Sequence, residues 1–542
     1  MGENNLKSRK SEVGRQKSGR KTEVGNQASA QTSDISHRPS LAIEKEPSLK
    51  FLKSLAKDLP KMEMYLVGGM VRDVLLNKAT GKDFDFVCRN VPLAKLIKSL
   101  KKHGSVNPVG RVFGVIKFVP KNSTLPDAID IALPRQDFSF GTGGYRDLKT
   151  QSNERLPIED DLARRDFTIN AIAFRLPTTN YNLPTTNSLI DPFNGRKDLD
   201  HKVIRSVGKP DDRFKEDYSR MLRAIRLCCK LNFKIENKTW LAVKKLMPRI
   251  SDERLINKKK MRVVPMETAS KELQKALVAN PSLAVELLDK SGALKQLMPE
   301  VLKMKKCPQP KNFHAEGDVW EHTKLMLKKM HDKGFKKQFP TVKSTSDLAL
   351  ICLLHDAAKP LTIKTPEKDG TDRIRFNEHA EVGAELAEKI GRRLTLSNDQ
   401  IKRIVFAIRH HMVVMSVKNI YQIRTHKFAE RFMDSPYSED LMMLFYLDSV
   451  ATVPPSGKPN MKNFKDTLKR IAEIKKTRSH QPIKIINGDQ IMKVLGVKPG
   501  PLVGKVLAEL AELKDSGKIN NQKEAREFLE KNKKKILSNY EK

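Results

Sequence analysis

Three things are scarce in this 542-residue sequence: cysteine, long apolar runs and acidic residues. The 5 cysteines show no C-x-x-C spacing, which argues against disulfides or a zinc site and for thiols in a reducing compartment. No apolar run approaches the roughly 18 residues that span a bilayer, so no membrane partner is expected. The 64 acidic residues face 103 lysines and arginines, a formal charge of +39. This excess favours a polyanionic partner, nucleic acid ahead of an anionic membrane.

The distribution of residue types along the chain predicts a sheet-containing domain, here called the head, followed by helical regions. Residues 1–47, rich in Lys, Arg, Ser, Gln and Gly, are expected to form a disordered basic arm, and their acids argue against a transit peptide. Short apolar runs alternate with helices over residues 48–208, which predicts a small sheet. Helical periodicity then dominates in a neck and body (209–306), a further domain (307–480) and a C-terminal tail (481–542). The expected fold class is α+β.

The head carries its clearest chemical signal where an apolar run ends at Gly68 and Gly69, shortly before the sequence D-F-D-F-V. In an extended strand Asp83 and Asp85 share one face. Two carboxylates on a rigid strand suit a pair of Mg²⁺ ions that hold a nucleoside triphosphate. The glycines leave room for phosphates, which Arg72 in the next helix can bind. An ordinary strand edge with solvated acids is the competing interpretation, since D-x-D often occurs by chance.

Four more residues extend this candidate site. Asp130, in the run D-A-I-D-I-A, would share the exposed face of the first pair if its strand is a neighbour. Arg164 and Arg165 directly precede Asp166. The two arginines suit a triphosphate, and the acid suits a ribose hydroxyl.

A helix expected over residues 214–226 would place Asp217 and Arg220 on one face. Such a pair is usually a solvated salt bridge. An aspartate can also accept a hydrogen bond from an exocyclic amine while a neighbouring arginine donates to a base acceptor. The pair could therefore read the Watson–Crick edge of cytosine or adenine and refuse guanine or uracil.

These motifs, in this order, resemble the class II tRNA nucleotidyltransferase and bacterial poly(A) polymerase family of the polymerase-β-like superfamily, over about residues 60–255. The resemblance implies that Asp83 and Asp85 bind the catalytic metals and that the G-G and R-R-D motifs hold the nucleotide. It also implies that Asp217 and Arg220 act as a protein template that selects CTP or ATP. One departure is that residues 258–260 and 262–265 intervene before Glu267, where family members run directly into a helix.

Histidines and aspartates recur in the second half of the chain. Imidazoles and carboxylates on neighbouring helices form a mixed site for one or two divalent metals, and Lys359 can meet a phosphate. Their order resembles the HD phosphohydrolase superfamily, which implies hydrolysis of a phosphoester by a metal-activated water. A domain that kept the fold but lost activity is the alternative. The implied core ligands are His322, His355, Asp356 and Asp448, with His379 and either His410 or His411 at a second metal position.

The chain looks like the bacterial CCA-adding enzymes that carry an HD domain, and its C-terminal run from Ile486 is similar to theirs. That run predicts a turn opening a basic helix that could meet RNA phosphates. The resemblance implies Mg²⁺-dependent addition of C, C and A from CTP and ATP to the tRNA 3′ end, in the cytoplasm and without an obligate protein partner.

Three alternatives stay open. A poly(A) polymerase would carry an Arg-Arg-Phe run at residues 110–114, where this chain has G-R-V-F-G. A CC-adding or A-adding enzyme would differ in the loop at residues 139–149, where Arg146 and Asp147 could act as a lever that reorients the site for ATP. The third alternative is a hydrolase whose head only binds RNA.

Overall fold

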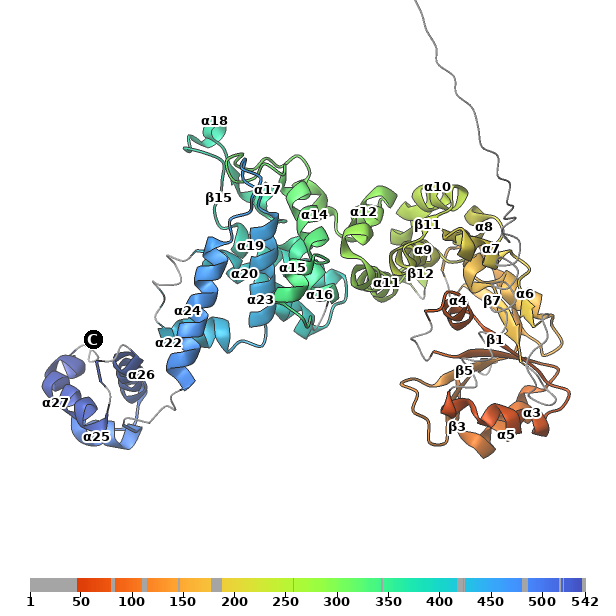
Figure 1. The fold of residues 1–542 in the computed structure, drawn as a ribbon, viewed down its shortest axis with the longest axis horizontal. Coiled ribbons are helices and arrows are strands. Elements are labelled where there is room, and N and C mark those ends of the chain that lie inside the picture. Colours follow the sequence, from red (N-terminus) through yellow and green to blue (C-terminus); the bar gives the residue numbers. More distant parts are fainter. Residues whose placement is uncertain are drawn as a thin grey trace, which may run out of the picture. The chain divides into compact units, whose positions relative to one another are not determined.

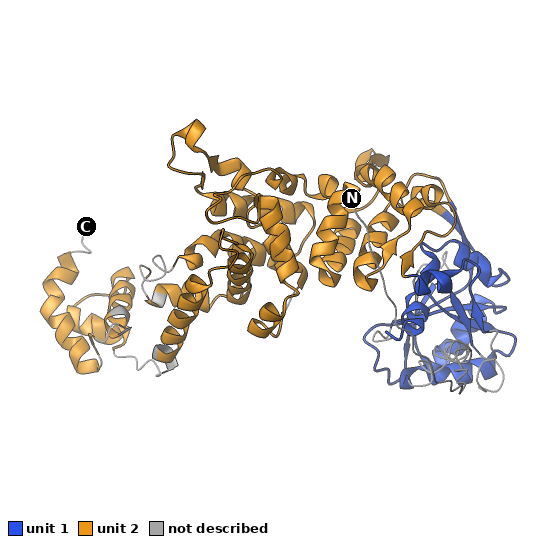
Figure 2. Ribbon diagram, turned by 45° about the horizontal axis from the view of Figure 1, so that its top comes forward, with its two compact units in different colours: residues 1–138, 149–201 blue, residues 139–148, 202–542 orange. Residues whose placement is uncertain are grey.

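The computed structural model describes residues 46–78, 83–109, 115–144, 147–176, 188–256, 258–342, 345–416, 423, 425–479, 486–515, 518–519 and 521–538. The chain forms two compact units, coloured separately in Figure 2: residues 1–138 with 149–201, and residues 139–148 with 202–542. Nearly all of the predicted basic arm, the G-R-V-F-G run and Arg146 lie outside the described residues.

The first unit, the head, is built on a mixed seven-stranded sheet with the order β3-β4-β5-β2-β1-β8-β9 (Figure 1). Its central strands β1 and β2 have largely buried side chains, as their apolar sequences predict. Strand β2 pairs antiparallel with β1 and parallel with β5. The strands are β1 (Glu63–Val67), β2 (Asp85–Arg89), β3 (Gly104–Val109), β4 (Val115–Pro120), β5 (Ile129–Ala132), β8 (Ala173–Arg175) and β9 (Leu189–Ile190).

Helices and a separate two-stranded ribbon accompany this sheet. The ribbon consists of β6 (Arg135–Ser139) and β7 (Leu148–Ser152). The α-helices of the head are α3 (Phe51–Asp58), α4 (Gly69–Leu75), α5 (Leu93–His103), α6 (Ile158–Ala163) and α7 (Gly195–Asp200).

The predicted α+β class is confirmed. Within the run T-I-N-A-I-A-F, residues Thr168–Asn170 form a 3₁₀ turn, and β8 begins only after it. The polar side chains cause the turn: Thr168 donates to Asp198 and Asn170 donates to Asp166. Such side-chain bonds compete with strand pairing.

The second unit starts with a neck that corrects one expectation from the sequence. Residues 214–226 do not form one helix, because α8 (Pro210–Glu216) ends before α9 (Ser219–Leu231) begins. Between them Asp217 is extended, with φ −157° and ψ 103°. Its carboxylate accepts hydrogen bonds from the backbone N–H of Ser219 at 2.8 Å and from the Ser219 hydroxyl at 2.6 Å. An aspartate that bonds the chain two residues ahead starts a new helix and does not continue the old one.

The rest of the neck is helical, apart from two short strand pairs. A hairpin formed by β12 (Glu253–Ile256) and β13 (Lys259–Arg262) occupies the place where the sequence departs from the family. The other pair is β10 (Val203–Ile204) with β11 (Lys234–Ile235). The remaining α-helices are α10 (Asn237–Leu246), α11 (Met266–Ala279), α12 (Pro281–Ser291) and α13 (Ala293–Leu297).

The next region is a bundle around α16 (Thr345–Leu354). From Leu348 onward every residue of α16 is apolar, and residues 346–354 are buried among α11, α14, α20 and α23. A small strand pair, β14 (Ile363–Lys364) with β15 (Arg375–Phe376), interrupts the helical pattern. The main surrounding helices are α14 (Val319–Lys329), α17 (Lys359–Thr362), α19 (His379–Arg393), α20 (Asn398–Met415), α23 (Ser438–Ala451) and α24 (Lys462–Ser479).

The C-terminal helices have a core of their own. Apolar side chains such as Ile491, Val506 and Leu529 form a cluster shared by α25 (Gly488–Leu495), α26 (Pro501–Asp515) and α27 (Gln522–Ser538). Asn487 caps α25 and Gly496 ends it in the left-handed conformation, as the tight turn in the sequence predicts. Within the described part of the chain, no helix combines the length and apolarity needed to cross a membrane.

Candidate active sites

The carboxylates of the head gather at the start of β2. The parallel pairing of β2 with β5 places Asp85 directly opposite Asp130, and Asp83 lies just ahead of the strand, exposed. Lys117 on β4 donates from Nζ to Asp130 Oδ2 at 2.9 Å. The same Nζ lies 2.6 Å from Asp130 Oδ1, but the geometry is not that of a hydrogen bond. Asp130 Oδ1 is therefore buried without a hydrogen bond to any described residue.

The protonation of Asp85 reflects this crowding. Burial, followed by the charges of Asp83 and Asp130, raises the pKa of Asp85 to about 6, against the opposing charges of Arg165 and Lys117. Carboxylates that repel one another in a partly buried place favour a bound cation, and oxygen ligands are those that Mg²⁺ prefers. The residues present therefore fit a divalent metal here, although these contacts do not identify which one.

The glycine turn before α4 borders the same carboxylates. Gly68 has φ +79°, a conformation that L side chains rarely adopt. A Cβ at Gly68 would lie 3.1 Å from Arg165 Nη1 and 3.4 Å from Asp85 Oδ2, so a larger residue would intrude on both. Gly69 follows as the first residue of α4. The turn thus brings glycine backbone, one carboxylate and one guanidinium to the same place.

The two predicted phosphate-binding arginines are held by one buried acid. Arg164 donates to Asp161 at 2.6 and 3.0 Å, and Arg165 donates to it at 3.1 Å. Burial acts to raise the pKa of Asp161, but the charges and hydrogen bonds of both arginines outweigh it and hold the pKa below its usual value. The sequence analysis missed Asp161, although its spacing of three and four residues from the arginines was a signal.

Arg72 and Asp166 belong to a buried chain of hydrogen bonds. Arg72 donates to Asp73 at 2.7 Å and to Asn170 at 2.6 Å, and Asn170 donates to Asp166 at 3.1 Å. Arg72 is only 4% exposed. The guanidinium therefore ties α4 to the segment that follows the two arginines, and a direct contact from Arg72 to a phosphate stays a prediction.

In the second unit, the predicted base-selecting pair lies at the junction of α8 and α9. Arg220 donates to Glu216 at 2.6 Å and to the backbone oxygen of Arg213 at 3.1 Å, while Asp217 bonds Ser219. The pair does not lie on one helical face, because Asp217 precedes α9. The role of the pair in reading a base stays a prediction. Glu216, which orients Arg220, was not singled out by the sequence analysis.

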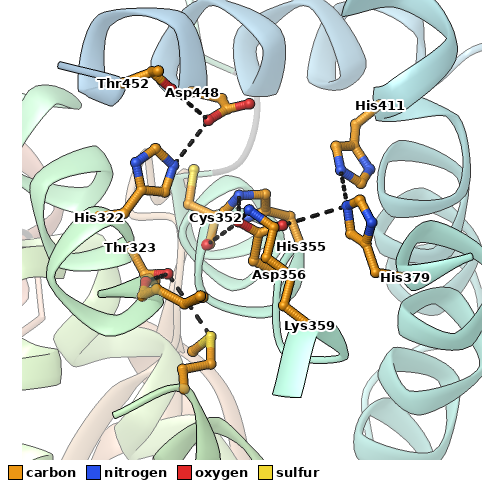
Figure 3. A network of polar contacts seen from close by, with 12 residues as sticks. His322, Thr323, Cys352, His355, Asp356, Lys359, His379, His411, Asp448 and Thr452 are labelled. Carbon is orange, nitrogen blue, oxygen red and sulfur yellow. Dashed lines mark hydrogen bonds and ion pairs between the residues drawn. The ribbon is translucent and has the colours of Figure 1, made fainter. Parts of the chain in front are cut away.

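The histidines and aspartates of the helical bundle converge into two adjoining groups (Figure 3). Within each group the candidate ligand atoms lie within 4.8 Å of one another. His355 Nε2 lies 3.1 Å from Asp356 Oδ2, which links the groups. One consists of His322, His355 and Asp448, and the other of Asp356, His379 and His411.

The imidazoles are oriented as metal ligands are in proteins. Nδ1 of each ring contacts an acceptor: Glu316 for His322, and backbone oxygens for His355, His379 and His411, at 2.6 to 2.9 Å. A proton on Nδ1 leaves the lone pair of Nε2 free to bind a metal.

The Nε2 atoms point at one another and at carboxylates. Nε2 of His379 lies 3.2 Å from Nε2 of His411, and Nε2 of His322 lies 2.8 Å from Asp448 Oδ1 without hydrogen-bond alignment. Burial and the charges of neighbouring imidazoles lower the pKa of His411 to about 3, so this ring stays neutral. Two neutral rings that present lone pairs to one another, beside carboxylates, fit one or two divalent cations.

The structure distinguishes two adjacent histidines that the sequence left as alternatives. His411 joins the second group, whereas the ring of His410 packs edge-on between Phe406 and Phe432. His411 is therefore the candidate ligand of the second metal position, and the expectation for His410 is corrected to a role in aromatic packing.

Two polar residues around this site were not assigned beforehand. Glu316 accepts from both His314 and His322, and these bonds hold its pKa at about 2 although burial acts to raise it. Gln309 accepts a hydrogen bond from Lys359 at 2.9 Å, and Lys359 also pairs with Asp356 at 2.6 Å. Glu316 lies between His314 and His322 in the sequence, but only the fold brings Gln309 to Lys359.

Comparison with known proteins identifies the domains that carry the two candidate sites. Residues 64–205 match the family described as Poly A polymerase head domain, and residues 319–451 match the HD domain. An A-adding tRNA nucleotidyltransferase of Deinococcus radiodurans is 30% identical over 69% of this chain and 79% of its own length. A multifunctional CCA protein of Shewanella denitrificans is 30% identical over 68% and 78%. The Thermotoga maritima CCA-adding enzyme complexed with tRNA shares the fold, at 20% identity and a TM-score of 0.54 over 92% of this chain and 98% of that one.

The head domain and the HD domain together define a nucleotidyltransferase that carries an HD domain. The chain belongs to the class II tRNA nucleotidyltransferase family and carries an HD domain, as the sequence predicts. The predicted nucleotidyltransferase activity is likewise confirmed. Divalent metals are typical of both the head and the HD domain.

Proposed function

We propose that this enzyme adds C, C and A to the 3′ end of tRNA from CTP and ATP, without a nucleic-acid template. The observation that carries the proposal is the parallel strand register that sets Asp85 opposite Asp130. Asp85 also lies beside Gly68 and Arg165. The relatives named as multifunctional CCA proteins and the fold shared with a tRNA-bound enzyme support the substrate. We place the reaction in the cytoplasm, where tRNA and nucleoside triphosphates meet.

The residues take distinct roles in this proposal. Asp83, Asp85 and Asp130 would hold Mg²⁺, which when bound would polarise the α-phosphate and neutralise the triphosphate. Arg164 and Arg165, kept in place by Asp161, bind phosphates. The 3′-hydroxyl of tRNA attacks the α-phosphate and pyrophosphate leaves. Head residues that orient both reactants lower the barrier by removing the entropic cost of bringing them together.

Three tRNA transcripts test this function: one ending before CCA, one after C and one after CC. Each is incubated with Mg²⁺ and with both CTP and ATP, one of which is labelled. We expect three nucleotides on the first substrate, two on the second and a single A on the third. Activity on the third alone would make the enzyme an A-adding one, as the Deinococcus relative is named. A stop after CC would make it a CC-adding enzyme. A long run of A on unrelated RNA would identify a poly(A) polymerase.

Base selection by Asp217 and Arg220 is the second part of the proposal. Asp217→Ala or Arg220→Ala should lower the preference for CTP and ATP over UTP and GTP more than it weakens tRNA binding. Their location at the junction of α8 and α9, with Arg220 oriented by Glu216, supports this role. Unchanged selectivity in both variants would exclude it.

We further propose that the HD domain hydrolyses phosphoesters. The convergence of four Nε2 atoms with Asp356 and Asp448 supports a metal site there, and Lys359 is one turn from Asp356 to meet a phosphate. A bound divalent metal would supply an activated water. His355→Ala should remove phosphoesterase activity on p-nitrophenyl phosphate or 2′,3′-cyclic AMP and leave nucleotide addition intact. A purified protein without divalent metal, and unable to bind any, would refute the proposal.

A further inference from the structure

A buried glutamine beside the HD site uses only half of its amide. Gln309 is 4% exposed. Its Oε1 accepts a hydrogen bond from Lys359 Nζ at 2.9 Å, whereas its Nε2 is buried without a hydrogen-bond partner among the described residues. Because a lysine can only donate, this contact fixes which end of the amide is the oxygen and which is the nitrogen. Buried donors without an acceptor are rare in native proteins and call for a ligand or another specific cause.

The segment that carries Gln309 is fixed before any ligand binds. Pro308 and Pro310 flank the glutamine and restrict its backbone. The N–H of Val319 donates to the carbonyl of Cys307 at 3.1 Å, which ties this segment to the start of α14, the helix that carries a ligand of the first group. The unused donor is therefore preorganised, as groups that bind charge in enzyme sites are.

The unpaired nitrogens of this domain differ in what they can bind. Nε2 of His322 and Nε2 of His355 are also buried without a hydrogen bond to the part of the chain that the structure describes. When unprotonated, these ring nitrogens offer lone pairs and suit a metal. The amide nitrogen of Gln309 offers only hydrogens. It therefore requires a different ligand, one that presents an acceptor oxygen.

Lys359 places a positive charge beside this donor. Its Nζ lies 2.6 Å from Oδ2 of Asp356, a member of the second candidate metal group (Figure 3). An ammonium has three N–H donors, and the contacts to Asp356 and Gln309 account for two of them. An ammonium and an amide side by side can donate to two oxygens of one phosphate. Hydrogen bonds to an ionised acceptor of this kind are stronger than those between neutral groups.

We propose that Gln309 Nε2 and Lys359 Nζ together form a phosphate-binding subsite of the HD domain, next to its candidate metal ligands. A phosphoester bound there accepts one hydrogen bond from the amide and one from the ammonium. Gln309 thus contacts the substrate itself, besides orienting Lys359 through Oε1. This subsite rests on the proposed phosphoesterase activity and adds to it a residue that binds the phosphate.

Two substitutions of Gln309 separate a phosphate contact from a role that only orients Lys359. Gln309→Met removes both polar atoms of the amide. Gln309→Glu keeps an acceptor for Lys359 but replaces the donor with a charge that repels phosphate. We expect kcat/KM on p-nitrophenyl phosphate and on 2′,3′-cyclic AMP to fall about tenfold in Gln309→Met and about 100-fold in Gln309→Glu. Asn312→Asp, which adds the same charge at an exposed position of this segment, should leave both values nearly unchanged.

Phosphate binding gives a readout that does not depend on turnover. Inorganic phosphate is titrated by calorimetry into the full chain loaded with divalent metal. The difference between each variant and the wild type cancels anion sites elsewhere on this basic protein. The affinity should fall in both Gln309 variants while their metal content stays at the wild-type level. Unchanged affinity in both variants would overturn the inference.

The remaining outcomes decide different points. Activity in Gln309→Glu equal to or above that of Gln309→Met means that the glutamine acts only through Lys359, and overturns the inference. A loss confined to 2′,3′-cyclic AMP also overturns it, because the two substrates share only the phosphate. If Gln309→Met does not fold, as judged by circular dichroism, Gln309→Asn withdraws the amide by one methylene and should still weaken phosphate binding. A wild-type protein that holds metal but hydrolyses neither ester refutes the proposed phosphoesterase activity, and the phosphate titration then decides the subsite by itself.

Discussion

The two candidate metal sites of this chain differ in how far the protein alone assembles them. In the HD domain the ligands are buried, and Nδ1 of each imidazole already contacts an acceptor. In the head, Asp83 is exposed and Asp130 bonds Lys117. Mg²⁺ commonly takes one or two carboxylates together with substrate phosphates, so a site of the second kind is completed by the nucleotide. We therefore expect the HD site to hold a resident metal, and the head site to take up a metal that arrives with its substrate.

Removal of one head carboxylate should give the largest effect. Asp85→Asn keeps the shape of the side chain but removes a charge opposite Asp130, and we expect addition of both CMP and AMP to fall about a thousandfold or more. Phosphoesterase activity should not change, because the HD ligands lie on helices of the second unit and Asp85 lies on a strand of the head. Single-turnover incorporation of labelled nucleotide measures the loss. Asp127→Asn, an exposed acid just before β5, is the matched control. An Asp85→Asn enzyme with normal incorporation would remove the head carboxylates from the mechanism.

Neighbouring histidines provide a sharper test of the HD site. His411→Gln should abolish tight metal binding at the second position, because His411 Nε2 faces His379 there. His410→Gln should keep the metal and lower the melting temperature, because it disturbs the packing between Phe406 and Phe432. Metal analysis of the purified variants, together with thermal unfolding, separates the two effects. Equal metal content in both variants would contradict the assignment of the second group.

The different surroundings of His410 and His411 could have been predicted from their helical spacing. Ile404, Ile408 and His411 follow one another at four and three residues, the spacing of a single helix face. His410 instead follows Phe406 by four residues. The pairing of Asp85 with Asp130 was likewise predictable, since alternation in two neighbouring strands brings such residues together.

Other features could not be read from spacing. The break at Asp217 was hidden because helical patterns continue on both sides, whereas two hydrogen bonds from Ser219 to the Asp217 carboxylate determine it. The approach of Gln309 to Lys359 joins residues far apart in sequence. The place of residues 139–148 within the second unit depends on contacts with Lys215 and Tyr218 that local sequence does not specify.

The smallest of the expected effects concerns Glu316, which contacts Nδ1 of His322 at 2.8 Å and accepts from the backbone N–H of Val453 at 3.0 Å. A carboxylate at this position makes the imidazole a stronger ligand and fixes its orientation. Glu316→Gln keeps the size of the side chain but weakens the contact, and metal affinity should fall by about 10- to 100-fold. Competition with a chromogenic chelator measures that affinity. Glu321→Gln, which removes an exposed acid from α14, the helix that carries His322, should leave the affinity unchanged. If Glu316→Gln binds metal as tightly as the wild type, the orientation of His322 does not depend on this carboxylate, and the HD site is less prepared than its geometry indicates.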